Sequence, residues 1–236
     1  TIEIYHNNLL RNKNLGVISR SYYWFEYENH KLPVRCTKQI KEDIILDINS
    51  DEKVIYHFIV SICQVSGILV KKSLIENKIN KRYFIETASV ILPLIRESKA
   101  LLLGRNTVAV RIDSSNTFEK KFYINSPGKA WLSLFNSVFY EKKYNKTLNF
   151  LKSKFISKNF DGLIQLRVYG GYGPLFKELI LMIKTSPKII LNLKIYIYFL
   201  FLVIPNKKFI NFIKIYYKRH ILSKNISDKI TNLVEY

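Results

Sequence analysis

The sequence has few of the residues from which small cross-linked or fibrous proteins are built. Two cysteines, Cys36 and Cys63, are too few for a disulfide framework or for a zinc site, which needs about four ligands. The 8 glycines and 6 prolines are too scarce for a fibrous or low-complexity chain. Hydrophobic residues make up 48% of the 236 positions, which is enough for a buried core and excludes a disordered tail. A reducing, cytoplasmic compartment is therefore the default prediction.

Several motifs that mark enzyme sites are also absent. The chain has no GxxxxGK[ST] phosphate loop, no HExxH metal helix and no D-x-D pair. The nearest approach to a D-x-D pair is Asp47-Ile-Asn-Ser-Asp51, whose spacing is wrong. The four histidines are scattered without the spacing of metal ligands, at positions 6, 30, 57 and 220. We therefore identify no metal ligands in this sequence.

Acidic residues are scarce in the C-terminal part. Residues 142–224 hold 17 lysines and arginines against two acids, Asp161 and Glu178, and so carry +15 of the net charge of +20. Of the 38 basic residues, 29 are lysines and 9 are arginines, whereas arginine is the side chain that reads phosphates and bases bidentately. This charge predicts a surface that meets polyanions, either an anionic membrane or nucleic acid.

Strand and helix patterns mix over the first part of the chain. β-Branched and aromatic residues predict strands, and apolar residues at helical spacing predict helices. The predicted strands are Leu15–Tyr27, Ile68–Val70, Ala100–Leu103 and Thr107–Ile112, and the predicted helices are Lys53–Cys63 and Thr87–Ser98. Gly104 is expected to join the last two strands, and Ser73 to cap a single helical turn. Pro93 is expected to kink the second helix or to shift its start. Residues 28–52 are expected to be mostly loop.

From Ser126 onward the strand patterns weaken and helices are expected. Their predicted ranges are 127–141, 145–158, 161–169, 174–185, 188–204 and 206–223. The glycines between Tyr169 and Pro174 lack the lysine of a phosphate loop and predict a turn between helices. Two regions follow from this change of pattern, an α/β part over 1–125 and a helical, basic part over 126–236.

Two charged residues lie where chemistry could occur. Glu86 precedes a predicted helix, where it could take a proton from a hydroxyl nucleophile as a general base or serve as an N-terminal capping acid. Arg111 ends a predicted strand, where it could bind a phosphate or carboxylate or form a surface ion pair with Asp113. The sequence leaves both pairs of alternatives open.

The C-terminal segment has the pattern of a helix that lies on a membrane. The apolar run Ile189–Ile204 has 16 residues, or about 24 Å of helix, which is short of the roughly 30 Å hydrocarbon core. In the next helix, lysines occupy one side and aromatic and aliphatic residues largely the other. The expected membrane contacts are Lys207, Lys208, Lys214 and Lys218. The alternative is a pair of packed helices with solvated lysines.

The order of these segments resembles the second half of a family 2 glycosyltransferase. The similarity is greatest to the abequosyltransferase-like enzymes that build bacterial O-antigen and capsule repeat units, and it extends over roughly residues 10–175. The segments that carry it are Leu15–Phe25, Val65–Leu74, Tyr83–Thr87, Ala100–Gly104, Val108–Asp113 and Ser126–Trp131. Its weight comes from the succession of these segments.

The resemblance implies a GT-A (Rossmann-like) fold, with an α/β half that binds the nucleotide sugar through a D-x-D metal motif and a following acceptor half. It places Ser66 and Gly67 on the acceptor side, Glu86 at the position of the base, and Arg111 where the donor pyrophosphate is held. Many members have an acidic pair where this chain has Glu86-Thr87. The resemblance also implies a divalent cation, Mg²⁺ or Mn²⁺, and a polyprenyl-diphosphate-linked acceptor.

We therefore expect a glycosyltransferase of the hexosyltransferase type, or its C-terminal part, bound peripherally at the cytoplasmic face of the inner membrane. Because the chain begins at Thr1 and lacks the D-x-D motif, residues 1–125 are expected to be the C-terminal part of the catalytic domain. One alternative is a basic nucleic-acid-binding protein, which the scarcity of arginine and the placement of aromatics in apolar runs disfavour. Another is a non-catalytic remnant of a truncated glycosyltransferase gene.

Overall fold

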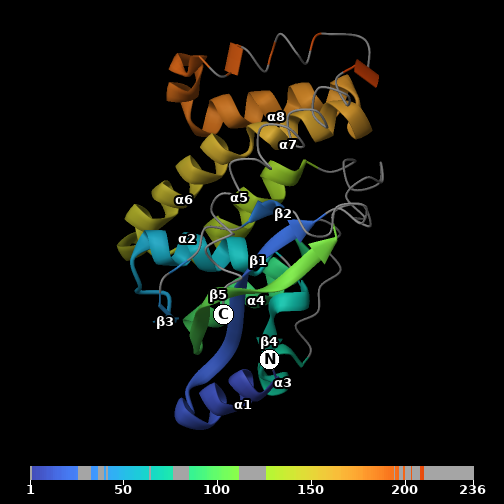
Figure 1. Ribbon diagram of the computed structural model, residues 1–236. Coiled ribbons are helices and arrows are strands. Elements are labelled where there is room, and N and C mark those ends of the chain that lie inside the picture. The colour runs from blue at the N-terminus through green and yellow to red at the C-terminus, as the bar shows by residue number, and fades with distance from the viewer. Residues whose placement is uncertain are drawn as a thin grey trace. The chain divides into compact units, whose positions relative to one another are not determined.

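The protein is mixed α/β, with a small sheet in its first part and helices in its second (Figure 1). The computed structural model describes residues 2–25, 33–36, 40, 42–63, 65–76, 85–111, 126–193, 195–196, 199, 203 and 208–209. The described residues up to 111 belong to one compact unit, and those from Ser126 onward belong to a second. Each unit is described here by itself.

A mixed sheet forms the centre of the first unit. Its strands are β1 (Leu15–Phe25), β2 (Pro33–Cys36), β3 (Ile44–Leu46), β4 (Leu69–Val70) and β5 (Lys99–Arg111). Strands β1 and β5 run parallel, paired from Leu15 with Lys99 to Phe25 with Arg111. The order is β2-β1-β5-β3, in which β2 and β3 run antiparallel to their neighbours, and β4 pairs antiparallel with the first part of β1.

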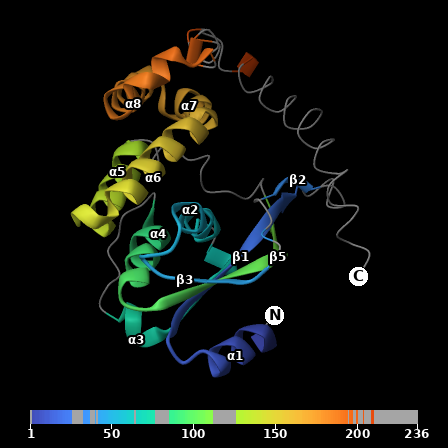
Figure 2. The same ribbon diagram turned by 90° about the vertical axis from the view of Figure 1, so that its left-hand side faces the viewer.

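Helices cover both faces of this sheet. They are α1 (Ile2–Arg11), α2 (Glu52–Ser61), α3 (Lys72–Ile75) and α4 (Glu86–Ile91), with 3₁₀ segments η2 (Val65–Gly67) and η3 (Leu92–Arg96). Ser19 of β1 accepts a hydrogen bond from Ser61 of α2 at 2.8 Å, whereas the neighbouring Arg20 contacts Tyr5 of α1. Since successive side chains of a strand point to opposite faces, α1 and α2 lie on opposite sides of the sheet (Figure 2).

Strand β1 supplies much of the core because it is covered on both faces. Its residues from Leu15 to Tyr22 are all buried. On the α1 side, Ile18 packs with Tyr5 and with two leucines of β5, Leu101 and Leu103. A strand buried on both faces reads as a nearly continuous apolar run, which is why this strand was predicted from the sequence.

The second unit is helical. Its elements are α5 (Pro127–Val138), η6 (Lys142–Tyr144), α6 (Asn145–Lys158), α7 (Phe160–Gln165), the π-helical segment η7 (Leu166–Gly170), α8 (Tyr172–Thr185) and the 3₁₀ segment η8 (Pro187–Leu191). Its apolar core draws residues from α6, α7, α8 and η8, including Ile156, Leu163, Leu179 and Ile189. Gly171 joins η7 to α8 with a φ of 88°, a left-handed conformation that favours glycine.

A buried carboxylate joins the start of α5 to α8. Glu178 Oε2 accepts a hydrogen bond from Ser126 Oγ at 2.5 Å, and Oε1 accepts one from the Gly128 N–H at 2.7 Å. Ser126 Oγ in turn accepts from the Lys129 N–H at 3.0 Å and so caps α5. Glu178 thereby satisfies donors at a helix N-terminus that would otherwise lack intrahelical partners.

Most predicted elements of the first unit are present. Helix α1 and strand β2 were not predicted, and four further differences concern other segments. Ile44–Leu46, expected in a loop, forms β3 through antiparallel pairing with Ala100–Leu102. The two strands expected on either side of Gly104 are one strand, whose pairing register with β1 shifts between Leu103 and Val108.

The other two differences concern helices. The single turn α3 is present, but Lys71 precedes it without a side-chain cap, so the prediction that Ser73 caps this turn was wrong. The helix expected over Thr87–Ser98 begins as α4 and continues as η3, because Pro93 has no N–H with which to extend the α-helical ladder.

In the second unit, α5, α6 and the turn between helices at Gly171 confirm the sequence-based predictions. Helix α8 begins at Tyr172, two residues before the predicted start, directly after the turn. The stretch expected to be helical from 188 begins instead as the 3₁₀ segment η8. In the helix expected over 206–223, only Lys208 and Phe209 are described, and both have helical backbone.

A side chain at position 128 should destabilise the second unit. A Cβ at Gly128 would overlap Glu178 Oε1, whereas a Cβ at Gly173, the second residue of α8 as Gly128 is of α5, would meet nothing within 4 Å. Gly128→Ala should therefore lower the free energy of unfolding by about 1–3 kcal/mol, while Gly173→Ala should change it by less than about 1 kcal/mol. Urea denaturation measures both. Equal effects of the two substitutions would show that the contact with Glu178 is not tight.

Candidate functional site

The Ser66-Gly67 segment lies against the middle of the sheet. A Cβ on Gly67 would lie 3.4 Å from Arg20 Cγ of β1 and 3.8 Å from Val108 Cγ2 of β5. The Tyr5 hydroxyl of α1 donates a hydrogen bond to the Gly67 carbonyl at 3.4 Å. Gly67 is therefore packed between α1 and the two parallel strands, and a larger residue at this position would contact Arg20.

Arg20 forms a buried positive centre beside this segment. It is 5% exposed, and its guanidinium carbon lies 5.0 Å from the centroid of the Tyr5 ring, within cation–π range. Burial raises the pKa of the Tyr5 hydroxyl, and the charge of Arg20 together with a hydrogen bond opposes this rise. Sequence reasoning did not single out Arg20. Arg20 could have been recognised as the one charged residue within the largely apolar segment Leu15–Phe25.

Glu86 is the first residue of α4, and its side chain is exposed. Its backbone carbonyl accepts a hydrogen bond from Ser89 Oγ at 2.8 Å. Ile85, the preceding N-cap residue, makes no side-chain capping hydrogen bond, so a carboxylate in the first turn is favoured by the helix dipole. This position is open to an incoming hydroxyl group, and it also suits a first-turn helix acid.

Arg111 lies at the carboxyl end of the parallel pair. Its backbone pairs with Phe25, the last residue of β1. In open α/β sheets, ligands bind in the crevice beyond the carboxyl ends of the strands. Asp113, the alternative ion-pair partner of Arg111, lies outside the described residues.

The predicted site residues are distributed along the first unit. The contacts of Gly67 go to α1, β1 and β5, while Glu86 begins the helix that leads into β5. Among the described ranges, no group of three or more His, Cys, Asp or Glu residues could hold a metal ion. The described part of the chain therefore does not supply the ligand set of the divalent cation that the family resemblance implies.

A cavity of about 420 Å³ lies at the opposite end of the parallel strands. It is bounded by Leu15 and Gly16 at the start of β1 and by Ser98 and Lys99 at the start of β5, and none of the predicted site residues lines it. The charged residues along its wall are Lys13, Asp47, Lys71, Arg96, Glu97 and Lys99. Four of these are basic and two acidic, so the cavity attracts anions rather than cations.

Among the residues of the second unit that the structure describes, the buried charged side chains are Arg167 and Glu178. The guanidinium carbon of Arg167 lies 3.6 Å from the centroid of the Tyr172 ring. Burial raises the pKa of the Glu178 carboxyl, and the hydrogen bonds from Ser126 and Gly128 oppose this rise. One of the two acids in the basic stretch 142–224 is thus removed from the surface.

Of the four lysines expected to contact a membrane, Lys208 is exposed, and Lys207, Lys214 and Lys218 lie outside the described residues. Within the described ranges, no helix has the length and apolar character needed to cross a bilayer.

Comparisons with protein families, with curated proteins and with solved structures find no match to this chain.

The buried carboxyl of Glu178 should make stability depend on pH. Its pKa is higher in the folded protein than in the unfolded chain, so its contribution is fully present below the unfolded value of about 4.3 and is lost as pH rises through the folded value. Glu178→Gln keeps an acceptor for the Gly128 N–H and supplies a donor to Ser126, so it should abolish this loss. Urea denaturation across that pH range measures the difference between the two proteins.

Glu141→Gln is the control for this prediction, because it removes a partly exposed acid of the same unit that pairs with Lys143. The Glu141→Gln protein should still lose stability as pH rises through this range. If Glu178→Gln and the parent protein lose stability in parallel across the range, the carboxyl of Glu178 does not titrate with folding.

Proposed function

We propose that this chain is a glycosyltransferase, or its C-terminal part, that transfers a sugar from a nucleotide sugar to a lipid-linked oligosaccharide in surface-polysaccharide (O-antigen or capsule) biosynthesis. The parallel pairing of β1 with β5 carries this proposal. The family resemblance expects the strands within residues 15–112 to be neighbours in one sheet, and it assigns Ser66 and Gly67 to the acceptor side. Gly67 packs near Arg20 of β1 and Val108 of β5.

The course of the chain supports the assignment of Glu86 and Arg111 to one site. Helix α4 and η3 lead through Glu97 and Ser98 into the amino end of β5. Glu86 is the first residue of this helical stretch, and Arg111 is the last residue of β5. An acceptor bound beyond the carboxyl ends of the strands would approach both residues.

The reaction proposed for this site is an inverting transfer. The Glu86 carboxylate takes the proton of an acceptor hydroxyl as that oxygen attacks the anomeric carbon of the donor sugar. The bond between the anomeric carbon and the diphosphate oxygen breaks, and the nucleoside diphosphate leaves with the electron pair. The Arg111 guanidinium stabilises the charge that develops on the leaving diphosphate.

A divalent cation, Mg²⁺ or Mn²⁺, is part of the same proposal, but its ligands would lie outside the described residues. No step assigned to Glu86 or Arg111 depends on it. The acceptor is proposed to be linked to polyprenyl diphosphate, so the enzyme would work peripherally at the cytoplasmic face of the inner membrane. The helices of the second unit, which lack a membrane-spanning candidate among their described residues, suit attachment to a surface.

Substitution of Glu86 tests the proposed chemistry. The full-length protein is incubated with labelled nucleotide sugars and polyprenyl-diphosphate-linked oligosaccharides, and the label entering the lipid fraction is measured. Glu86→Gln should lower kcat by about 10²–10⁴-fold and leave the Kd of the donor unchanged, because a general base acts in the transition state.

Glu52→Gln provides a matched control, because Glu52 is the first residue of α2 as Glu86 is of α4. Each substitution removes a first-turn charge worth about 0.3–1 kcal/mol, so both should change stability by similar amounts. Equal, small effects on kcat would make Glu86 a helix acid and remove it from the mechanism. Absence of transfer from every nucleotide sugar tested would overturn the proposed function.

A further inference from the structure

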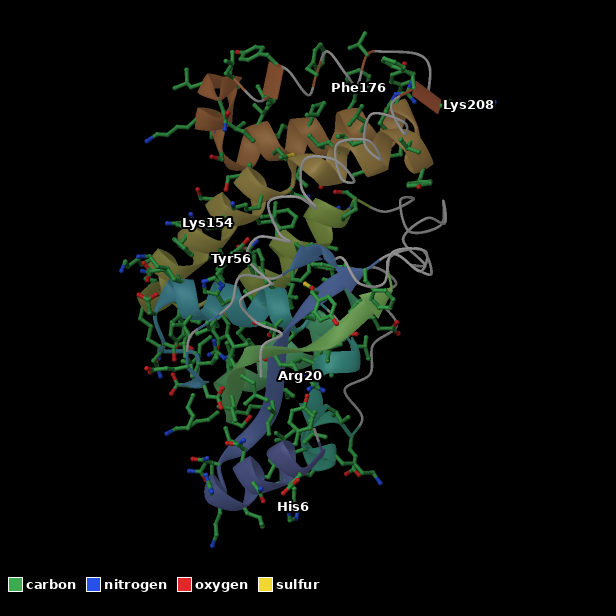
Figure 3. All side chains as sticks on the ribbon, viewed as in Figure 1. His6, Arg20, Tyr56, Lys154, Phe176 and Lys208 are labelled. Atoms are coloured by element: carbon green, nitrogen blue, oxygen red, sulfur yellow. The ribbon has the colours of Figure 1, made fainter. Side chains whose placement is uncertain are left out.

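Helix α8 has two apolar faces, only one of which packs in the core. Leu175, Leu179 and Met182 are buried in the core of the second unit. Phe176 and Ile180, one helical turn apart on another side of the helix, are 46% and 52% exposed. Phe176 lies on the outer side of α8 (Figure 3). A surface helix normally carries polar residues away from its buried stripe. The exposed pair Phe176 and Ile180 is therefore expected to lie against an apolar partner.

The chain that follows α8 extends this exposed apolar area. Leu191 of η8 is 87% exposed and Leu193 is 72% exposed. The Tyr172 hydroxyl donates a hydrogen bond to the Val203 carbonyl at 3.4 Å, so the following segment returns to the start of the same stripe. We use the term outer apolar surface for six exposed residues of this region: Tyr172, Phe176, Ile180, Ile190, Leu191 and Leu193.

Outside residues 172–209, the exposed large apolar residues of the described part of the chain are Leu10, Ile45, Val65 and Tyr140, and each belongs to a different segment. Within that range, Tyr196, Phe199, Val203 and Phe209, which follow η8, are exposed as well. Single exposed apolar side chains are ordinary in soluble proteins, whereas contiguous apolar areas mark sites of interaction. The outer apolar surface is therefore a feature of the second unit that requires a partner.

The charges on the same elements identify the kind of partner. Lys177, Lys184 and Lys188 are exposed on α8 and η8. Glu178 is the only acid in the sequence from Gly162 to Lys224, and its side chain is fully buried. The elements that carry the outer apolar surface thus expose lysines and no carboxylate, which is the combination that binds a bilayer with anionic lipids.

Other partners fit this combination less well. A second copy of the chain would bring its own lysines to the same surface, and their like charges would repel. Nucleic acid would satisfy the lysines but would leave the apolar area exposed to water. An anionic bilayer accommodates both, because its acyl chains take up apolar side chains while its headgroups attract lysine ammonium groups.

We propose that α8 and η8 form a membrane-docking surface, in which the outer apolar surface enters the interface of an anionic bilayer and Lys177, Lys184 and Lys188 contact its headgroups. This surface lies earlier in the chain than the lysines at 207–218 that the sequence pattern indicated. The inference rests on the proposed function in one respect, namely that the membrane carries the lipid-linked acceptor. Docking itself needs no substrate.

Co-sedimentation of the full chain with lipid vesicles tests the docking surface. Vesicles of phosphatidylcholine containing about one third phosphatidylglycerol should bind the protein, and vesicles of phosphatidylcholine alone should bind it at least tenfold more weakly, because the anionic surface potential is lost. The double substitution Phe176→Ser with Ile180→Ser should weaken binding to the anionic vesicles by at least tenfold. Both side chains are substantially exposed, so the fold should survive, as circular dichroism would verify.

Leu10→Ser with Ile45→Ser is the matched apolar control, because these side chains are exposed outside the second unit at 65% and 47%. This control should bind the vesicles as the parent protein does. For charge, changing Lys177, Lys184 and Lys188 together to Gln should weaken binding by about 100-fold, since each lysine near an anionic surface contributes about fivefold. Changing the exposed Lys142, Lys146 and Lys158 to Gln removes the same charge from other elements and should have a smaller effect.

Three results would overturn the proposal. One is equal weakening by the test and control substitutions, which would mean that net charge or general hydrophobicity drives binding. Another is a dimer in sedimentation velocity that the Phe176→Ser, Ile180→Ser protein cannot form, which would assign the surface to a second copy. The third is stronger binding to single-stranded RNA than to anionic vesicles. Vesicle binding that persists in a protein inactive in sugar transfer would remove the proposed function and leave the docking surface intact.

Discussion

The parallel pairing of β1 with β5 is the constraint on which the first unit depends. Parallel strands cannot be joined by a hairpin, so the chain that leaves β1 at Phe25 has to return to the other end of the sheet before it enters β5 at Lys99. That return path contains α2, η2, β4 and α4. It therefore determines where Gly67 packs against the sheet, and it makes Glu86 the start of the helical stretch that leads into β5. The proposed site is a consequence of this one crossover.

Burial of the Glu178 side chain removes a carboxylate from the surface of the second unit. Glu178 satisfies the hydroxyl of Ser126 and the N–H of Gly128 at the start of α5, and its burial leaves the exposed parts of α8 and η8 without a carboxylate. One residue thus helps to hold two helices together and gives the outer apolar surface its uniformly basic surroundings. Packing and surface electrostatics are linked through this side chain.

Elements with strong local patterns could be predicted from the sequence, and elements that depend on distant partners could not. Strand β1 and helices α5 and α6 follow from apolar runs and periodicity, whereas the cap of α5 by Ser126 was not predicted. Strand β3 has three residues and exists because Ala100–Leu102 pairs with it, which no local pattern shows. For the same reason, the sequence did not predict the contact of Arg20 with Tyr5 or the hydrogen bonds of Glu178. Glu86 and Arg111 were identified by type and position, but the sequence could not tell which residues would surround them.

The hydrogen bond from Gly128 to Glu178 joins residues that are 50 positions apart. During synthesis, the first turn of α5 leaves the ribosome long before its acceptor is made. The turn remains without this buried partner until α6, α7 and the first half of α8 have been translated. The contact between the start of α5 and α8 therefore waits for the synthesis of Glu178.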